Sequence, residues 1–181
     1  TTQIFSMPSN TQAGVYELDI SVYDNDSSGR LNSGETTISF IINQVATSML
    51  PSISKLEVTP EDELTLGAEV FDQAGEKMNA LVNVEITSPD QTEIQQTLTG
   101  GEFITYNFSS DAEPGIWGVI FSFSNLTIEK EFTMTEFQKA SFDLVDSTLT
   151  ITNVGNTVYS KVVEIIIGEE TEVLDDLEID V

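Results

Sequence analysis

The sequence predicts an all-β protein built from stacked sheets. Apolar and polar residues alternate with period two along nearly every segment, and almost no segment shows the 3.6-residue period of a helix. Clusters of Gly, Pro, Asp and Asn, which favour turns, separate these segments at short intervals. The 181 residues, 39% of them hydrophobic, are enough to build one large domain or two small ones around a buried core.

The N-terminal region contains two long strand patterns. GVYELDISVYD begins at Gly14 and ETTISFIINQ begins at Glu35, and the acidic segment 24–35 connects them. Two strands joined as a hairpin cannot bury a hydrophobic face alone. We therefore interpret residues 1–46 as the C-terminal hairpin of a partial β-domain.

The middle region contains seven shorter strand patterns. They begin at Ser52, Glu63, Ala80, Glu93, Phe103, Ile116 and Leu126. Turn sequences such as TPED at 59–62 and DQAGEK at 72–77 separate them. Seven short strands in about 85 residues are typical of an immunoglobulin-like sandwich. We therefore predict that residues 47–136 form one complete sandwich domain.

Alternation along these strands also predicts part of the core. Leu64, Leu66 and Val70 fall on one face of their strand. Trp117 occupies an inward position of its strand, which favours a place in the core over a sugar-stacking platform.

The C-terminal region, residues 137–181, contains about four strand patterns, which is again less than a sandwich. We interpret it as the N-terminal part of a further β-domain. The whole chain is then a set of tandem immunoglobulin-like β-sandwich domains, of which the first and last are partial. An alternative is that the two partial ends pack on each other or on a neighbouring chain.

Composition excludes several classes of function. The chain has no cysteine and no histidine, which excludes thiolate metal sites, ordinary zinc sites, and triads that need histidine. The 31 acidic and 6 basic residues give a formal net charge of −25, which repels nucleic acid and anionic lipid. No apolar run approaches the roughly 20 residues that cross a bilayer, so we expect no membrane insertion by this segment.

Three stretches resemble known surface modules. AGVYELDISVYD, from Ala13, resembles the last hairpin of cadherin-like or PKD-like repeats. AEVFDQAGEKMNALVNVEITSPDQ and AEPGIWGVIFSF are similar to bacterial and macroglobulin-type immunoglobulin-like domains. LTITNVGNTVYSKVVEIIIGE resembles the CARDB/NEW3-like adhesion modules of archaeal and bacterial envelope proteins. These resemblances imply an excerpt of a prokaryotic, for example archaeal, multidomain protein at the cell surface or outside the cell.

The segment DNDSSGRLNSGE, residues 24–35, matches the spacing of an EF-hand-type calcium loop. Positions 1, 3, 5, 7, 9 and 12 of that loop are Asp24, Asp26, Ser28, Arg30 (through its backbone carbonyl), Asn32 and Glu35. Calcium takes six to eight oxygen ligands, and glycine at position 6, here Gly29, allows the sharp turn. Strands rather than helices flank this loop, so we predict an isolated calcium loop that stiffens the hairpin. The alternative is a solvated polar turn.

Three sequons predict glycosylation of asparagine if the protein is extracellular. They begin at Asn25, Asn107 and Asn125. Asn107 and Asn125 lie at predicted strand ends, and Asn25 occupies a non-ligand position of the acidic loop.

We expect no enzyme within these residues. Adjacent acids such as Asp175 and Asp176 fall in exposed patterns, whereas a glycosidase needs two carboxylates fixed across a cleft. The sequence therefore favours a structural or adhesive module of an envelope layer, stalk or filament, stabilised by calcium. Such a module would contact copies of itself or other surface proteins. The alternative is an accessory carbohydrate-binding module of a secreted enzyme.

Overall fold

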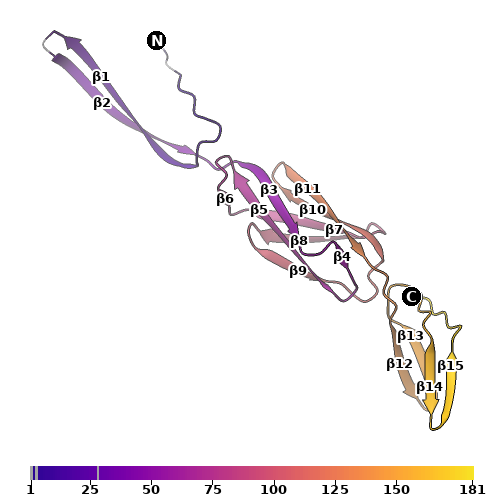
Figure 1. Ribbon diagram of the computed structural model, residues 1–181. Helices are drawn as coiled ribbons and strands as arrows, with labels where there is room; N and C mark the ends of the chain where they lie inside the picture. The colour runs from indigo at the N-terminus through magenta and orange to yellow at the C-terminus, as the bar shows by residue number, and fades with distance from the viewer. Residues whose placement is uncertain (1, 3, 28) are drawn as a thin grey trace. The chain divides into compact units, whose positions relative to one another are not determined.

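The computed structural model describes the backbone of residues 2, 4–27 and 29–181 and, apart from positions 25, 26, 30 and 31, their side chains. Strands account for most of the described residues, and none of these residues is helical (Figure 1). The described residues thus contain no helix that could cross a membrane. The all-β class is confirmed. The chain divides into two compact units, residues 1–49 with 70–78 and residues 50–69 with 79–181.

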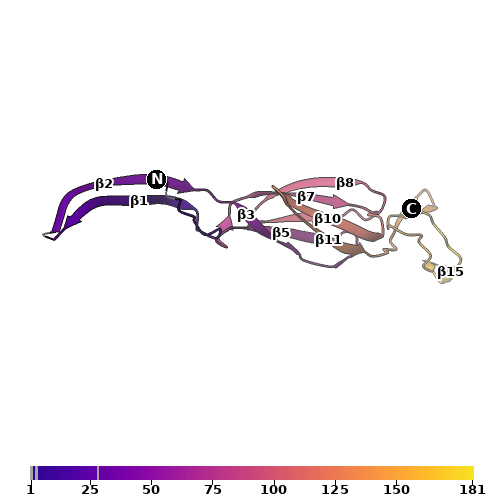
Figure 2. The same ribbon diagram turned by 90° about the horizontal axis from the view of Figure 1, so that it is seen from above.

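The first unit contains a long antiparallel hairpin. β1 (Gly14–Asp26) pairs with β2 (Gly29–Ile42) along nearly its whole length, as Figure 2 shows. Residues directly opposite each other point to the same face of a hairpin. One face therefore carries the stacked rings of Tyr16 and Phe40, whose centroids lie 5.7 Å apart, and the pair Leu18 and Ile38. The other face carries mainly polar side chains.

The middle region forms two sheets. Its strands are β3 (Ala46–Ile53), β4 (Glu57–Val58), β5 (Glu63–Asp72), β6 (Lys77–Met78), β7 (Leu81–Thr87), β8 (Glu93–Thr99), β9 (Phe103–Asn107), β10 (Gly115–Phe123) and β11 (Leu126–Met134). One sheet has the order β4-β11-β10-β7-β8, and the other contains β3, β5 and β6 with β9 paired to β5. This is the strand order of an immunoglobulin-like sandwich, including a short first-strand segment that runs parallel to the last strand. The predicted immunoglobulin-like sandwich fold is confirmed.

The core consists of the inward residues of alternating strands. Val82, Val84 and Ile86 of β7 and Phe121 of β10 have no exposed surface, and neither has Leu64 of β5. Trp117 is also buried, and its Nε1 donates a hydrogen bond to the Glu113 carbonyl at 2.9 Å. Both the predicted face of β5 and the predicted core position of Trp117 are confirmed.

One predicted strand differs from the structure. The pattern that begins at Ser52 is not a single strand, because β3 ends at Ile53 and β4 begins at Glu57. β3 belongs to the sheet of β5, whereas β4 pairs with β11 in the opposite sheet. The chain switches sheets in between, and the alternating pattern continues through the switch without marking it.

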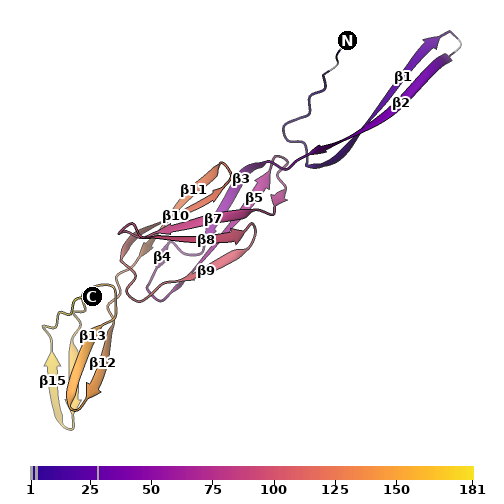
Figure 3. The ribbon, with the colours of Figure 1, turned by 180° about the vertical axis from the view of Figure 1, so that it is seen from behind.

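The C-terminal region contains two further hairpins (Figure 3). β12 (Ala140–Val145) pairs with β13 (Thr148–Asn153), and β14 (Val163–Ile167) pairs with β15 (Glu170–Leu174). Large apolar side chains remain exposed here, for example Leu144 and Ile167. The four expected strands are confirmed. The division into domains at 1–46, 47–136 and 137–181 stays a prediction, and its boundaries fall at the start of β3 and between β11 and β12.

Candidate functional site

The segment predicted to form a calcium loop instead consists mostly of two paired strands. β1 extends to Asp26 and β2 starts at Gly29, so most of the segment 24–35 belongs to the hairpin ladder. The ladder has a bulge at Asp24, between the pairs of Tyr23 and Asn25. At this bulge the Nδ2 of Asn32 donates a hydrogen bond to Oδ2 of Asp24 at 3.2 Å. Two of the six predicted ligands therefore lie together.

Glu35 does not lie with them. It pairs with Ser21, further from the hairpin tip than the pair of Tyr23 and Ser33. Because side chains alternate along a strand, Glu35 also points to the face opposite that of Asn32. The EF-hand-type wrapping predicted for residues 24–35 is therefore not the conformation of this hairpin, since strand pairing separates position 12 from position 1.

The other predicted ligands cannot be placed around an ion. Ser28 lies outside the described residues, and so do the side chains of Asp26 and Arg30. Among the side chains that the structure describes, no three acidic groups are placed to hold a metal ion. Calcium binding at the hairpin stays a prediction.

The sequons fall in different settings. Asn107 is the last residue of β9 and is exposed. Asn125 is exposed in the two-residue turn between β10 and β11. Asn25 lies in β1, and its side chain is outside the described set.

A side-chain amide holds the base of the N-terminal hairpin. In the turn between β5 and β6, Gln73 accepts a hydrogen bond from the backbone N–H of Val45 at 2.8 Å. Its Nε2 donates to the carbonyls of Thr11 and Asn43 at 3.1 and 3.0 Å. One half-buried side chain thus binds both chain segments that flank the hairpin.

The neighbouring Asp72 is 2% exposed and organises the same turn. Burial opposes ionisation of its carboxyl group, but hydrogen bonds outweigh this effect and lower its pKa. The donors are the backbone N–H groups of Glu76 and Ala74, each at 2.9 Å, and the amide of Gln44 at 3.2 Å. Asp72 therefore stabilises the turn as a carboxylate.

A second amide joins the C-terminal region to the sandwich. Asn156 is 6% exposed, and its Oδ1 accepts a hydrogen bond from the backbone N–H of Phe137 at 2.6 Å. Its Nδ2 donates to the carbonyls of Ala112 and Thr135 at 2.8 and 2.9 Å. A Cβ atom on Gly155 would lie 2.0 Å from the Phe137 carbonyl oxygen, so only glycine permits this approach of the two backbones.

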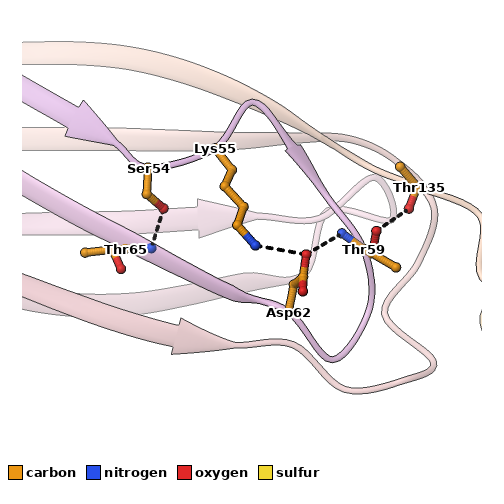
Figure 4. A network of polar contacts seen from close by, with 6 residues as sticks. All are labelled: Ser54, Lys55, Thr59, Asp62, Thr65 and Thr135. Atoms are coloured by element: carbon orange, nitrogen blue, oxygen red, sulfur yellow. Dashed lines mark hydrogen bonds and ion pairs between the residues drawn. The ribbon is translucent and has the colours of Figure 1, made fainter.

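Ion pairs flank this junction on the sandwich side. Lys139 Nζ lies 2.5 Å from Glu61 Oε1, and Lys55 Nζ lies 3.0 Å from Asp62 Oδ2. In Figure 4, Asp62 also reaches the backbone of Thr59, the start of a turn that the sequence predicted. The hydrogen bond from Lys55, followed by that from Thr59, lowers the pKa of Asp62. These acids support the turn.

The remaining adjacent acids lie at the surface. Glu169, Glu170, Asp175 and Asp176 are all exposed, as their sequence pattern predicted. They lie in and after the β14–β15 hairpin. Exposed carboxylates of this kind remain well solvated.

The sequence pattern identified neither Gln73 nor Asn156. Both lie in segments whose patterns were recognised, the DQAGEK turn and the NVGN segment. For Asn156 the available signal was the adjacent Gly155, which permits a close backbone approach, and no comparable signal marked Gln73. The carbonyl partners of these amides come from distant segments, so the pattern alone could not identify them.

Comparison with known proteins does not assign this chain to a family. No family model matches the chain, and no curated protein matches it. Among solved structures, an amphioxus IgVJ-C2 molecule aligns with 66% of this chain at 17% identity and a TM-score of 0.35. The chain spans 59% of the length of that structure. The immunoglobulin-like assignment rests on strand order and burial.

Proposed function

We propose that this chain is a non-catalytic structural module of a multidomain protein at the cell surface or outside the cell. The immunoglobulin-like sandwich supplies the rigid part. The C-terminal segment that follows β11 is attached to it through a side-chain amide rather than through a free linker. The observation that carries the proposal is the buried Asn156 with its three backbone partners.

The hydrogen bonds of Asn156 favour a C-terminal region that stays attached to the sandwich. A buried polar group that loses its partner costs about 1–3 kcal/mol. Phe137 and Asn156 both belong to the C-terminal region, so detaching that region would leave the carbonyls of Ala112 and Thr135, and the Nδ2 group of Asn156, without their partners. The junction is therefore expected to persist while the sandwich is folded.

Tryptic cleavage at Lys139 tests this proposal. Lys139 lies in the connection between β11 and β12, next to the bonds of Asn156. We expect slow cleavage there in the native chain and rapid cleavage in Asn156→Ala, because the variant releases the connection. Asn79→Ala, at an exposed position, is the matched control. Equal cleavage rates in Asn156→Ala and the native chain would contradict the proposal.

Calcium stabilisation of the hairpin is a separate hypothesis within this proposal. The acidic residues near the tip repel one another, and a bound cation would remove that repulsion. If calcium binds there, millimolar calcium raises the melting temperature, and Asp24→Ala abolishes the increase. Glu17→Gln, an acid further from the tip, serves as the control. An unchanged melting temperature in the native chain would exclude calcium as a stabilising ion of the hairpin.

One observation favours the alternative of carbohydrate binding. The outer face of β7, β8 and β10 has a shallow hollow of about 430 Å³, lined by polar groups that include Asn83, Gln95 and Ser122. Amides and hydroxyls of this kind pair with sugar hydroxyls. Binding to a glycan array that is lost in Gln95→Ala would favour this alternative, and an unaffected or absent signal would count against it.

A further inference from the structure

We propose that Asn125 accepts an N-linked glycan in the folded protein, whereas Asn107 can accept one only before its domain folds. The first half of the proposal concerns the turn between β10 and β11. Asn125 and Thr127, the acceptor and the hydroxyl residue of the sequon, are both exposed. Among the described residues, none forms a side-chain hydrogen bond with Asn125.

The position of this sequon in the sheet also favours access. Phe123 pairs with Leu126 and Ser122 with Thr127, so the sequon occupies the last rungs of the ladder at the hairpin end. On the other side of β11, β4 pairs only with Thr133 and Met134 among the described strands. Ser122 of β10 stays paired with Asn83 of β7, so residues 125–127 can leave β10 without breaking a pair to any other described strand. Terminal rungs open at small cost in free energy.

The sequon at Asn107 is held differently, although its first and third residues are exposed. Its middle residue, Phe108, is 5% exposed and belongs to the aromatic core. The Phe108 ring lies 4.8 Å from that of Tyr106, 5.3 Å from that of Trp117 and 5.5 Å from that of Phe132, centroid to centroid. An enzyme that draws the three residues into its active site must first remove Phe108 from the core.

The reaction needs a glycan donor, an isoprenyl pyrophosphate-linked oligosaccharide. The side-chain nitrogen of Asn125 forms a bond to the anomeric carbon of the first sugar. The bond between that carbon and the pyrophosphate oxygen breaks, and the pyrophosphate leaves with the bonding electrons. The nitrogen loses one proton, and no group is oxidised or reduced. The product is a bulky polar surface group at the turn.

In the cell this modification rests on the proposed extracellular location, but an assay with purified components does not. The full chain, folded or denatured, is incubated with a single-subunit oligosaccharyltransferase and the isoprenyl pyrophosphate-linked oligosaccharide, and peptide masses report occupancy at each sequon. Denatured chain should be modified at both Asn107 and Asn125. In folded chain we expect Asn125 to react at least about tenfold faster than Asn107, because the latter requires local unfolding.

Two variants make the result specific. Thr127→Ala should abolish modification of Asn125, and Thr127→Ser should retain it. Ser109→Ala should leave the occupancy of Asn125 unchanged. Equal rates at the two sequons in folded chain, or modification of Asn125 in denatured chain alone, would overturn the inference. Neither result bears on the junction at Asn156, so the proposed structural function is tested separately.

Discussion

At the scale of single residues, the molecule depends on polar side chains that bind backbone groups from distant segments. Gln73 binds the two segments that flank the N-terminal hairpin, and Asn156 binds the connection that follows β11. An amide has both donors and an acceptor, so one side chain can satisfy a backbone N–H and two carbonyls together. These contacts order segments that contribute little to the apolar core.

Replacing Gln73 tests the first of these contacts. Gln73→Ala removes three hydrogen bonds, each worth about 0.5–1.5 kcal/mol. We expect the free energy of unfolding to fall by about 1–3 kcal/mol, because solvent reaches part of this site and replaces some of the bonds. Denaturant unfolding measures the change. Gln96→Ala, an exposed glutamine of β8, should change it by less than about 0.5 kcal/mol. Similar values for both variants would contradict the role of Gln73.

The carboxylate of Asp72 predicts a dependence on pH. Its pKa is lower in the folded chain than the ordinary value of 3.8, so its ionised form stabilises the fold above that value. This contribution disappears as the pH falls through the lowered pKa. Asp72→Asn should therefore be less stable than the native chain at neutral pH, and the difference should shrink on acidification below the ordinary value of 3.8.

Urea unfolding at a series of pH values measures this difference. Asp111→Asn, which removes one exposed negative charge, is the control. A stability difference between Asp72→Asn and the native chain that stays constant with pH would show that the carboxylate has another role.

The sequence predicted the turn that contains Asp72 and Gln73, but not the hydrogen-bond partners of Gln73. Asp72 and Gln73 were recognised as part of a turn because Asp and Gly favour turns. The partners of Gln73 lie 28 to 62 residues away in sequence. Such pairs depend on how the strands are assembled, which local pattern does not encode.

At the scale of elements, alternation predicted the sandwich well. The inward and outward residues of β10 differ sharply in exposure, since Phe121 is fully buried and Ile116 is 63% exposed. The same period of two identified β5 and β7. Buried sandwich strands have strong alternation because one face packs in the core and the other faces water.

Two substitutions within β10 test this assignment. Phe121→Ala removes a ring from the core and should lower the free energy of unfolding by about 3–5 kcal/mol. Ile116→Ala, on the outer face of the same strand, should lower it by less than about 1 kcal/mol. Comparable losses in the two variants, measured by denaturant unfolding, would contradict the assignment of Phe121 to the inner face of β10 and Ile116 to its outer face.

Alternation and motif spacing made different predictions for the acidic hairpin. The spacing of acids from Asp24 to Glu35 matched a calcium loop, whereas the structure continues the strands almost to the tip. The pairs that separate Glu35 from Asp24 are backbone hydrogen bonds, which any residue except proline can make. Side-chain spacing alone could not therefore distinguish a loop from a ladder.

At the scale of the whole molecule, an immunoglobulin-like sandwich carries β-segments that expose much apolar surface. The formal net charge of −25 produces electrostatic repulsion between copies, which salt screens. The sandwich is stable through its own core, and the flanking segments depend on a few buried or half-buried amides.

Hydrogen exchange at the backbone amides that bind Gln73 and Asn156 tests the proposed structural role most directly. The backbone N–H of Val45 is bound to Gln73, and that of Phe137 is bound to Asn156. Measured by NMR on the native full chain, both amides should exchange far more slowly than unprotected peptide, as expected for segments held closed by these side chains. Exchange of either amide at the rate of unprotected peptide, while the amides of β7 and β10 remain protected, would contradict the proposal that Gln73 and Asn156 hold these segments in place.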